Sequence, residues 1–126
     1  MVEVVRLRHR REFLAAARGL KVPSHGFVLQ AVARKEPERA AMLGLGFTVT
    51  RKIGNAVVRN RARRRLREAV RPLLPGPAPQ GHDLVLVARP RAVDQPFAAL
   101  QADLAAALRQ AARRLAGDRP VAGRHP

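Results

Sequence analysis

Arginine is the residue type whose spacing in this chain suggests chemistry. Seven arginines fall between residues 59 and 71, with Glu68 as the only acid among them: Arg59, Arg61, Arg63, Arg64, Arg65, Arg67 and Arg71. Like charges at this density repel one another, so the segment becomes favourable beside a polyanion. Guanidinium groups donate paired hydrogen bonds to phosphate oxygens and stack on bases. This spacing therefore predicts the binding of a phosphate-rich polymer.

Residues that could break a covalent bond are scattered along the chain. An autonomous nuclease needs clustered carboxylates that hold metal ions, or a histidine that acts as a base. The four histidines show no metal-ligand spacing, and Glu36 and Glu38 lie in a charged segment that reads as a solvent-facing loop. Cysteine is absent, which excludes a disulfide, a thiolate metal site and a cysteine nucleophile. We therefore expect no catalytic residue and no metal site made by protein side chains alone.

The arginines also follow a helical pattern. At about 100° per residue, one face of the segment is apolar and the opposite arc is polar. The apolar face consists of Val58, Ala62, Leu66, Ala69, Val70 and Leu73. The polar arc consists of Asn60, Arg61, Arg63, Arg64, Arg67 and Arg71. This pattern predicts a helix over residues 53–73 that packs one side on a core and presents guanidinium groups on the other. Ala56 and Val57 are expected to pack this helix against a sheet. Gly54 either packs there or lets the backbone approach a phosphate.

The composition of the whole chain narrows the class of partner. A length of 126 residues suits one domain, and a net charge of +16 requires an anionic partner. Nucleic acid is the first candidate and an anionic membrane surface is the second. Residues 1–11 lack the apolar core of a secretory signal, and no apolar run approaches the length of a membrane span. We therefore expect a soluble, cytoplasmic protein.

Apolar periodicity predicts three helices and three strands. Helices are expected over residues 9–18, 53–73 and 97–115, and strands over residues 27–34, 42–50 and 83–88. The last strand is a continuous apolar run, which predicts burial on both faces. The order α-β-β-α-β-α predicts a small α+β or α/β sandwich with one sheet. Residues 116–126 lack periodicity and are expected to form a flexible C-terminal tail.

The segment from Lys52 to Arg67 closely resembles the signature of the bacterial ribonuclease P protein subunit. That family carries Lys-x-Gly-x-Ala-Val-x-Arg-Asn-Arg followed by further basic residues, and this chain matches the pattern without a gap. Glu12-Phe13 and Phe27-Val28-Leu29 also agree with the family, and the resemblance covers roughly residues 6–115. It implies a ribonuclease P protein domain over residues 1–115 with the α+β, α-β-β-α-β-α two-layer fold of the family. That fold has one small sheet and a left-handed β-α-β crossover, and is ribosomal protein S5 domain 2-like.

The resemblance also implies different roles for the protein and the RNA. In the family, a catalytic RNA subunit hydrolyses the phosphodiester bond at the 5′ end of the mature tRNA with magnesium ions, which the RNA mainly binds. The protein helps to bind the 5′ leader of precursor tRNA and stabilises the active RNA. This implies a monomeric protein that pairs with one catalytic RNA and has no membrane partner. The residues implied to bind that RNA are Lys52, Arg59, Asn60, Arg61, Arg63, Arg64, Arg67 and Arg71.

A second implied surface is the cleft for the leader, which in the family lies between the first helix and one face of the sheet. Family members stack unpaired bases there on aromatic side chains, and Phe13 matches one of these positions. Ala17 and Gln30 stand where the family has two further aromatics, so leader binding here should depend more on phosphate contacts. Thr48 and Thr50 are expected to supply hydroxyl donors in the same groove. The mouth of the cleft is expected to be lined by Arg8, Arg10 and Arg11.

Two other functions fit parts of the sequence. Composition alone suits a structural RNA-binding protein of the ribosome equally well. A membrane-surface protein could use the 53–73 helix, but its apolar face is rich in Ala and Val and lacks the Trp or Phe anchors of such helices. Function as a ribonuclease P subunit is therefore the main hypothesis, with the ribosomal protein as the alternative.

Overall fold

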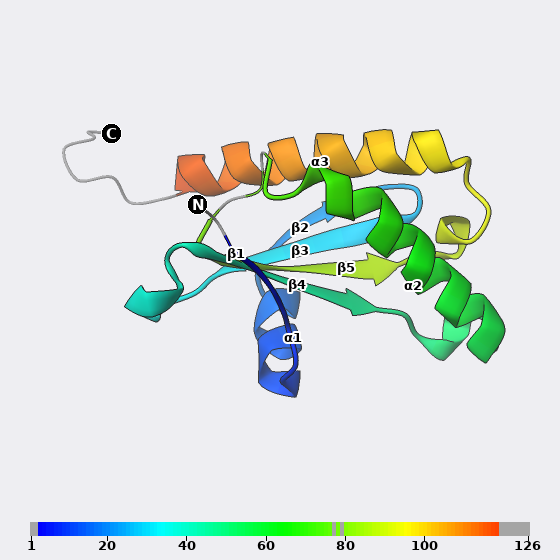
Figure 1. Ribbon diagram of the computed structural model, residues 1–126, viewed down its shortest axis with the longest axis horizontal. Helices are drawn as coiled ribbons and strands as arrows, with labels where there is room; N and C mark the ends of the chain where they lie inside the picture. Colours follow the sequence, from blue (N-terminus) through cyan, green and yellow to red (C-terminus); the bar gives the residue numbers. More distant parts are fainter. Residues whose placement is uncertain (1–2, 77, 79, 119–126) are drawn as a thin grey trace.

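The computed structural model describes residues 3–76, 78 and 80–118, which form a five-stranded sheet with helices on both faces (Figure 1). The strands are β1 (Glu3–Arg6), β2 (Leu20–Pro23), β3 (Phe27–Ala33), β4 (Met42–Thr48) and β5 (His82–Ala88). The helices are α1 (Arg10–Ala17), α2 (Ala56–Val70) and α3 (Phe97–Asp118). All six predicted elements are present, so the α+β class is confirmed.

The sheet has the strand order β1-β4-β5-β3-β2. The strands β1, β4 and β5 run parallel to their neighbours, whereas β3 pairs antiparallel with both β5 and β2. Because β4 and β5 are adjacent and parallel, the chain between them must cross one face of the sheet, and α2 lies in that crossover. The charged helix is therefore part of a β-α-β unit.

The main core lies between the sheet and the layer formed by α2 and α3, while α1 covers the opposite face (Figure 1). Side chains alternate between the two faces of each strand. Leu84 and Leu86 of β5 therefore face α2 and α3, whereas Val85 packs with Leu7 and Ala16 on the α1 side. This arrangement confirms that β5 is a central strand buried on both faces.

Two edge strands, β1 and β2, were not expected from the sequence. Each has only four residues, and at least half of each is exposed. Neither segment therefore carries enough apolar alternation to be recognised. The parallel pairing of β1 with β4 nevertheless shapes the surface beside α2, because β1 covers only part of the outer edge of β4.

The ends of two helices also differ from the predictions. The α-helical part of α2 is shorter than residues 53–73, because 3₁₀ turns at Arg51–Ile53 and Arg71–Leu73 precede and follow it. Pro72 explains the later end, since proline removes a backbone donor and clashes with the preceding turn. The helix α3 continues to Asp118, three residues past its predicted end. The rest of the predicted tail, residues 119–126, lies outside the described residues.

Candidate nucleic-acid interface

The start of α2 is built by three consecutive features of the sequence. Gly54 has φ of 150°, and a Cβ at this position would lie 2.9 Å from a methyl carbon of Val58. Asn55 is the N-cap, and its Oδ1 accepts a hydrogen bond from the Val58 N–H at 3.0 Å. Arg59 donates through Nη1 to the Gly54 carbonyl at 3.2 Å. Lys52 is exposed just before this start, close to the positive end of the helix dipole.

The apolar face of α2 agrees with its helical pattern. Ala62, Leu66, Ala69 and Val70 are buried against the core, while Val58 and Leu73 are half-buried. Of the residues predicted on the polar arc, Asn60, Arg61, Arg64, Arg67 and Arg71 are exposed and Arg63 is half-buried, as is Arg59; the single acid of this helix, Glu68, is also exposed. The two faces are therefore separated as the sequence predicted.

The expectation that Ala56 and Val57 pack against the sheet is wrong. Ala56 is exposed, and 76% of Val57 is exposed. Both belong to the first turn of α2, and burial in this helix begins only at Ala62. The first turn of α2 therefore adds an apolar side chain to the solvent-facing surface.

Two of the arginines stabilise the protein itself. Arg65 donates to the carbonyls of Ala92 and Gln95, and Arg61 donates through Nε to the Val93 carbonyl at 3.3 Å. These bonds attach α2 to the segment that leads into α3. Arg65 is half-buried whereas Arg61 remains exposed, so Arg61 keeps surface available for a ligand.

The arginines of α2 are not neutralised by the protein's own acids. Within the described residues, the ion pairs join His25 to Asp103, Arg34 to three carboxylates, and Arg91 to Asp94. None of these pairs includes a residue of α2. The bonds that α2 arginines do make go to backbone carbonyls and to the Asn60 side chain, so their full positive charge is retained.

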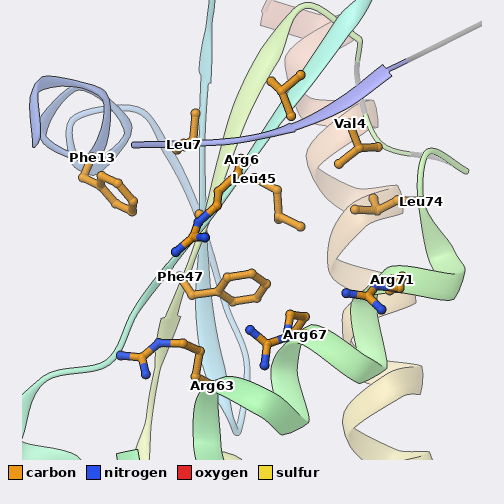
Figure 2. A pocket seen from close by; sticks show the side chains of 12 residues that line it. Val4, Arg6, Leu7, Phe13, Leu45, Phe47, Arg63, Arg67, Arg71 and Leu74 are labelled. Atoms are coloured by element: carbon orange, nitrogen blue, oxygen red, sulfur yellow. The ribbon is translucent and has the colours of Figure 1, made fainter. Parts of the chain in front are cut away.

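A hollow of about 690 Å³ lies between β1, β4 and α2 (Figure 2). Arg63 and Arg67 of α2 line it, together with Arg71 directly after that helix and Phe13 of α1. The Phe13 ring is half-buried against Gly46, where a Cβ would lie 2.6 Å from the ring. The structure therefore brings one residue of the predicted leader cleft and three of the predicted RNA-binding arginines to a single hollow.

The other predicted cleft residues are less closely grouped. Gln30 and Thr48 are half-buried on β3 and β4, and strand alternation places both on the sheet face that α1 covers. Ala17 is exposed at the end of α1, where its carbonyl accepts a hydrogen bond from the Lys21 ammonium at 2.6 Å. Thr50 is exposed beyond the end of β4, beside the 3₁₀ turn that precedes α2. Around the start of α1, Arg8, Arg10 and Arg11 are exposed, as is His9 between them.

A buried ionic cluster that the sequence did not reveal fixes α1 on the sheet. Arg34 directly follows β3, and its Nη1 contacts Asp83 Oδ2 at 2.7 Å and Glu12 Oε2 at 3.1 Å. The other Glu12 oxygen accepts the backbone N–H groups of Arg8 and His9 at 3.0 and 2.9 Å. Burial by itself raises the pKa of Glu12, but these N–H groups and the Arg34 charge outweigh it and hold that pKa below its usual value. The cluster therefore joins the start of α1 to β3 and β5.

The described residues offer neither a metal-ligand cluster nor a membrane span. No group of three or more His, Asp or Glu side chains in the described ranges is placed to hold a metal ion. No helix of the described part is long and apolar enough to cross a bilayer.

The α+β fold with an un-neutralised arginine helix defines a nucleic-acid-binding module. The sequence model of the family Ribonuclease P matches residues 1–112, and the chain belongs to this family. The ribonuclease P protein component of Gluconacetobacter diazotrophicus is 54% identical over 107 residues, covering 84% of this chain and 90% of that protein. The component of Erythrobacter litoralis is 46% identical over 105 residues, covering 83% and 84%.

Solved structures show the same fold. The ribonuclease P protein of Thermotoga maritima superposes with a TM-score of 0.68 at 29% identity, covering 83% of this chain and 96% of that chain. The protein of Staphylococcus aureus gives a TM-score of 0.68 at 27% identity, covering 84% and 94%. Nothing in these comparisons favours the ribosomal alternative.

Proposed function

We propose that this chain acts as the protein subunit of ribonuclease P, binding the catalytic RNA and the 5′ leader of precursor tRNA while the RNA performs the hydrolysis. The observation that carries this proposal is the α2 surface, where Arg61, Arg64 and Arg67 are exposed and no arginine of the helix has a carboxylate partner in the described residues. The positive charge of such a surface neutralises phosphates and so lowers the repulsion between two polyanions, and the release of their condensed counterions favours binding. The expected setting is the cytoplasm, with one protein bound to one RNA.

The residues proposed to contact the catalytic RNA lie on and just before α2. Arg64 and Arg67 are exposed, which leaves their guanidinium groups free to approach phosphate. Arg59 and Arg63 are half-buried, and each already donates one hydrogen bond within the protein, so each is held in a defined position. Arg61 contributes to both stability and binding. The set is completed by Lys52, Asn60 and Arg71.

The leader is proposed to lie on the sheet face beside α1. Phe13 offers a half-buried ring for stacking, whereas Ala17 and Gln30 cannot provide aromatic platforms. Arg10 and Arg11 stand at the start of α1, where they can meet the leader phosphates. Leader binding should therefore be more sensitive to salt than in relatives that stack more bases.

Magnesium belongs to the RNA partner in this proposal. The carboxylates of the described residues form no cluster of the kind that holds a divalent cation, so they do not fit a protein-bound magnesium site. Arg34 already pairs with Glu12, Glu36 and Asp83. The protein is therefore expected to act by positioning RNA, and no step of hydrolysis is assigned to its side chains.

Reconstitution at low magnesium tests the function. A bacterial ribonuclease P RNA is incubated with leader-bearing precursor tRNA, with and without this protein, and 5′ cleavage is measured. The protein should restore cleavage that the RNA alone cannot sustain, because it supplies positive charge that magnesium would otherwise provide. Failure to restore cleavage, or cleavage by the protein without RNA, would contradict the proposal.

A further inference from the structure

The hollow between β1, β4 and α2 combines an apolar floor with a cationic rim (Figure 2). Its apolar side chains include Val4, Leu45, Phe47 and Leu74. Its charged side chains are Arg6, Arg63, Arg67 and Arg71, and no Asp or Glu of the described residues lines it. A ligand that fits this lining carries both negative charge and an apolar face.

Phe47 lies at the centre of this arrangement. Its ring is half-buried, and Figure 2 shows it between Arg6 of β1 and Arg67 of α2. Arg63 lines the same hollow and donates through Nη1 to the Asn60 side chain at 3.0 Å, which restrains its position. An accessible aromatic ring flanked by guanidinium groups is the combination that proteins use to stack an unpaired base and bind its phosphate.

The hollow opens where β1 stops covering β4. The last paired residues are Arg6 and Leu45, and the Leu7 N–H donates to the Leu45 carbonyl at 3.0 Å, whereas β4 continues to Thr48. Backbone groups point to the same side of a strand at every second residue. The N–H and C=O of Phe47 therefore face the side of β4 on which β1 has ended. These groups can bond the polar edge of a base whose face lies on the ring.

The dimensions agree with a small ligand. A volume of about 690 Å³ lies within the range of about 300–1,000 Å³ typical of pockets for single small molecules. In double-stranded RNA the bases are stacked inside the helix, so a duplex could not place a base on the Phe47 ring. The positive charge of the arginines and the aromatic ring of Phe47 therefore favour one unpaired nucleotide as the ligand of this hollow.

We propose that the hollow between β1, the outer edge of β4 and α2 is a binding site for one unpaired RNA nucleotide. The base stacks on Phe47, and the phosphate is bound by Arg63 and Arg67. This inference rests on the proposed function as an RNA-binding subunit, and it adds a specific subsite between the charged helix and the sheet edge. A nucleotide bound here belongs to a single-stranded or bulged part of the RNA partner.

Nuclear magnetic resonance titration tests the site directly. The chain has only four phenylalanines, so their ring resonances can be assigned individually. Adenosine monophosphate, ribose 5-phosphate and inorganic phosphate are added separately to the full-length protein. Adenosine monophosphate should shift the Phe47 ring and the Arg67 side chain and bind about tenfold more tightly than ribose 5-phosphate, since stacking of one base is typically worth that factor or more. Equal affinities, or ring shifts confined to Phe13, would overturn the proposal.

Two variants separate the base contact from the phosphate contact. Phe47→Leu should abolish the preference for adenosine monophosphate while leaving the affinity for inorganic phosphate unchanged. Arg67→Gln, at an exposed position where the fold is not at risk, should weaken all three ligands by a similar factor. The amide spectrum of each variant reports whether it remains folded. A Phe47→Leu protein that keeps the base preference, or an Arg67→Gln protein that binds phosphate as before, contradicts the assignment.

The outcome can be distinguished from failure of the proposed function. If reconstitution with catalytic RNA fails but the base-dependent shifts at Phe47 appear, the nucleotide site is supported and the role in ribonuclease P is contradicted. If reconstitution succeeds and no base-dependent shift occurs, the role in ribonuclease P is supported and the nucleotide site is contradicted.

Discussion

Replacing Arg34 by methionine should destabilise the protein strongly at neutral pH. Methionine keeps an apolar stem in the same space but removes the cation between Glu12 and Asp83. The side chains of Glu12 and Asp83 are only 8% and 2% exposed, so water cannot readily replace the lost charge. The start of α1 would lose its attachment to β5 and leave two carboxylates buried close together.

The size of the effect follows from this burial. Removing one partner of a buried ion pair typically costs about 3–5 kcal/mol, because the remaining charge is left uncompensated. The Arg34 side chain keeps 17% of its surface exposed, which favours the lower end, about 3 kcal/mol. With a urea slope of about 1.5 kcal/mol per molar, the unfolding midpoint should fall by about 2 M.

The pH dependence of this loss has a definite sign. In the folded protein the pKa of Glu12 lies below its usual value, so the native contacts contribute stability above the unfolded-state pKa of about 4.3. That contribution is lost as the pH falls through the folded-state pKa. Arg34→Met removes one cause of the lowered pKa, so the difference between wild type and variant should begin to shrink only once the pH falls below about 4.3, and should shrink further towards the folded-state pKa.

The loss of unfolding free energy is measured by urea unfolding. Far-ultraviolet circular dichroism follows the transition, because the chain has no Trp or Tyr for fluorescence. The buffer should contain chloride and no phosphate or sulfate, since anions that bind the native state would raise its apparent stability. The matched control is Arg91→Met, which removes an exposed pair with Asp94 and should cost no more than about 1 kcal/mol. Equal losses for the two variants, or an Arg34→Met loss that does not shrink when the pH is lowered from 7 to well below about 4, would refute the reasoning.

Three further predictions concern RNA binding and the start of α2. Arg64→Ala should reduce the slope of log affinity against log salt concentration in RNA binding by about 0.7–0.9. Arg65→Ala should mainly lower the stability of the protein, because Arg65 donates to the protein's own carbonyls. Equal salt slopes for both variants would contradict these different roles of the two arginines. Phe13→Ala should weaken precursor tRNA binding to the holoenzyme more than mature tRNA binding, and an equal loss would reduce Phe13 to a packing role. Asn55→Ala should lower the free energy of unfolding by about 1 kcal/mol in urea titrations through loss of the N-cap, and no change would contradict the capping bond.

Local patterns in the sequence were sufficient for the main elements of the fold. The apolar residues of α2 recur at helical spacing, and those that the periodicity placed inward at Ala62, Leu66 and Val70 are buried. The continuous apolar run of β5 likewise corresponds to a strand with both faces covered. The short edge strands escaped recognition, because four mostly exposed residues carry little periodic signal and their pairing depends on β4 and β3.

The sequence by itself determined that the chain has an amphipathic, arginine-rich helix and an excess of positive charge, because composition and periodicity are properties of neighbouring residues. Only the tertiary structure decided the role of each arginine. Arg65 is engaged by carbonyls about thirty residues away, whereas Arg67, two positions along the same helix, faces a hollow built by β1 and β4. The Arg34 cluster likewise joins residues 22 and 49 positions apart. Such partners are set by how the sheet and helices pack, and no local pattern encodes them.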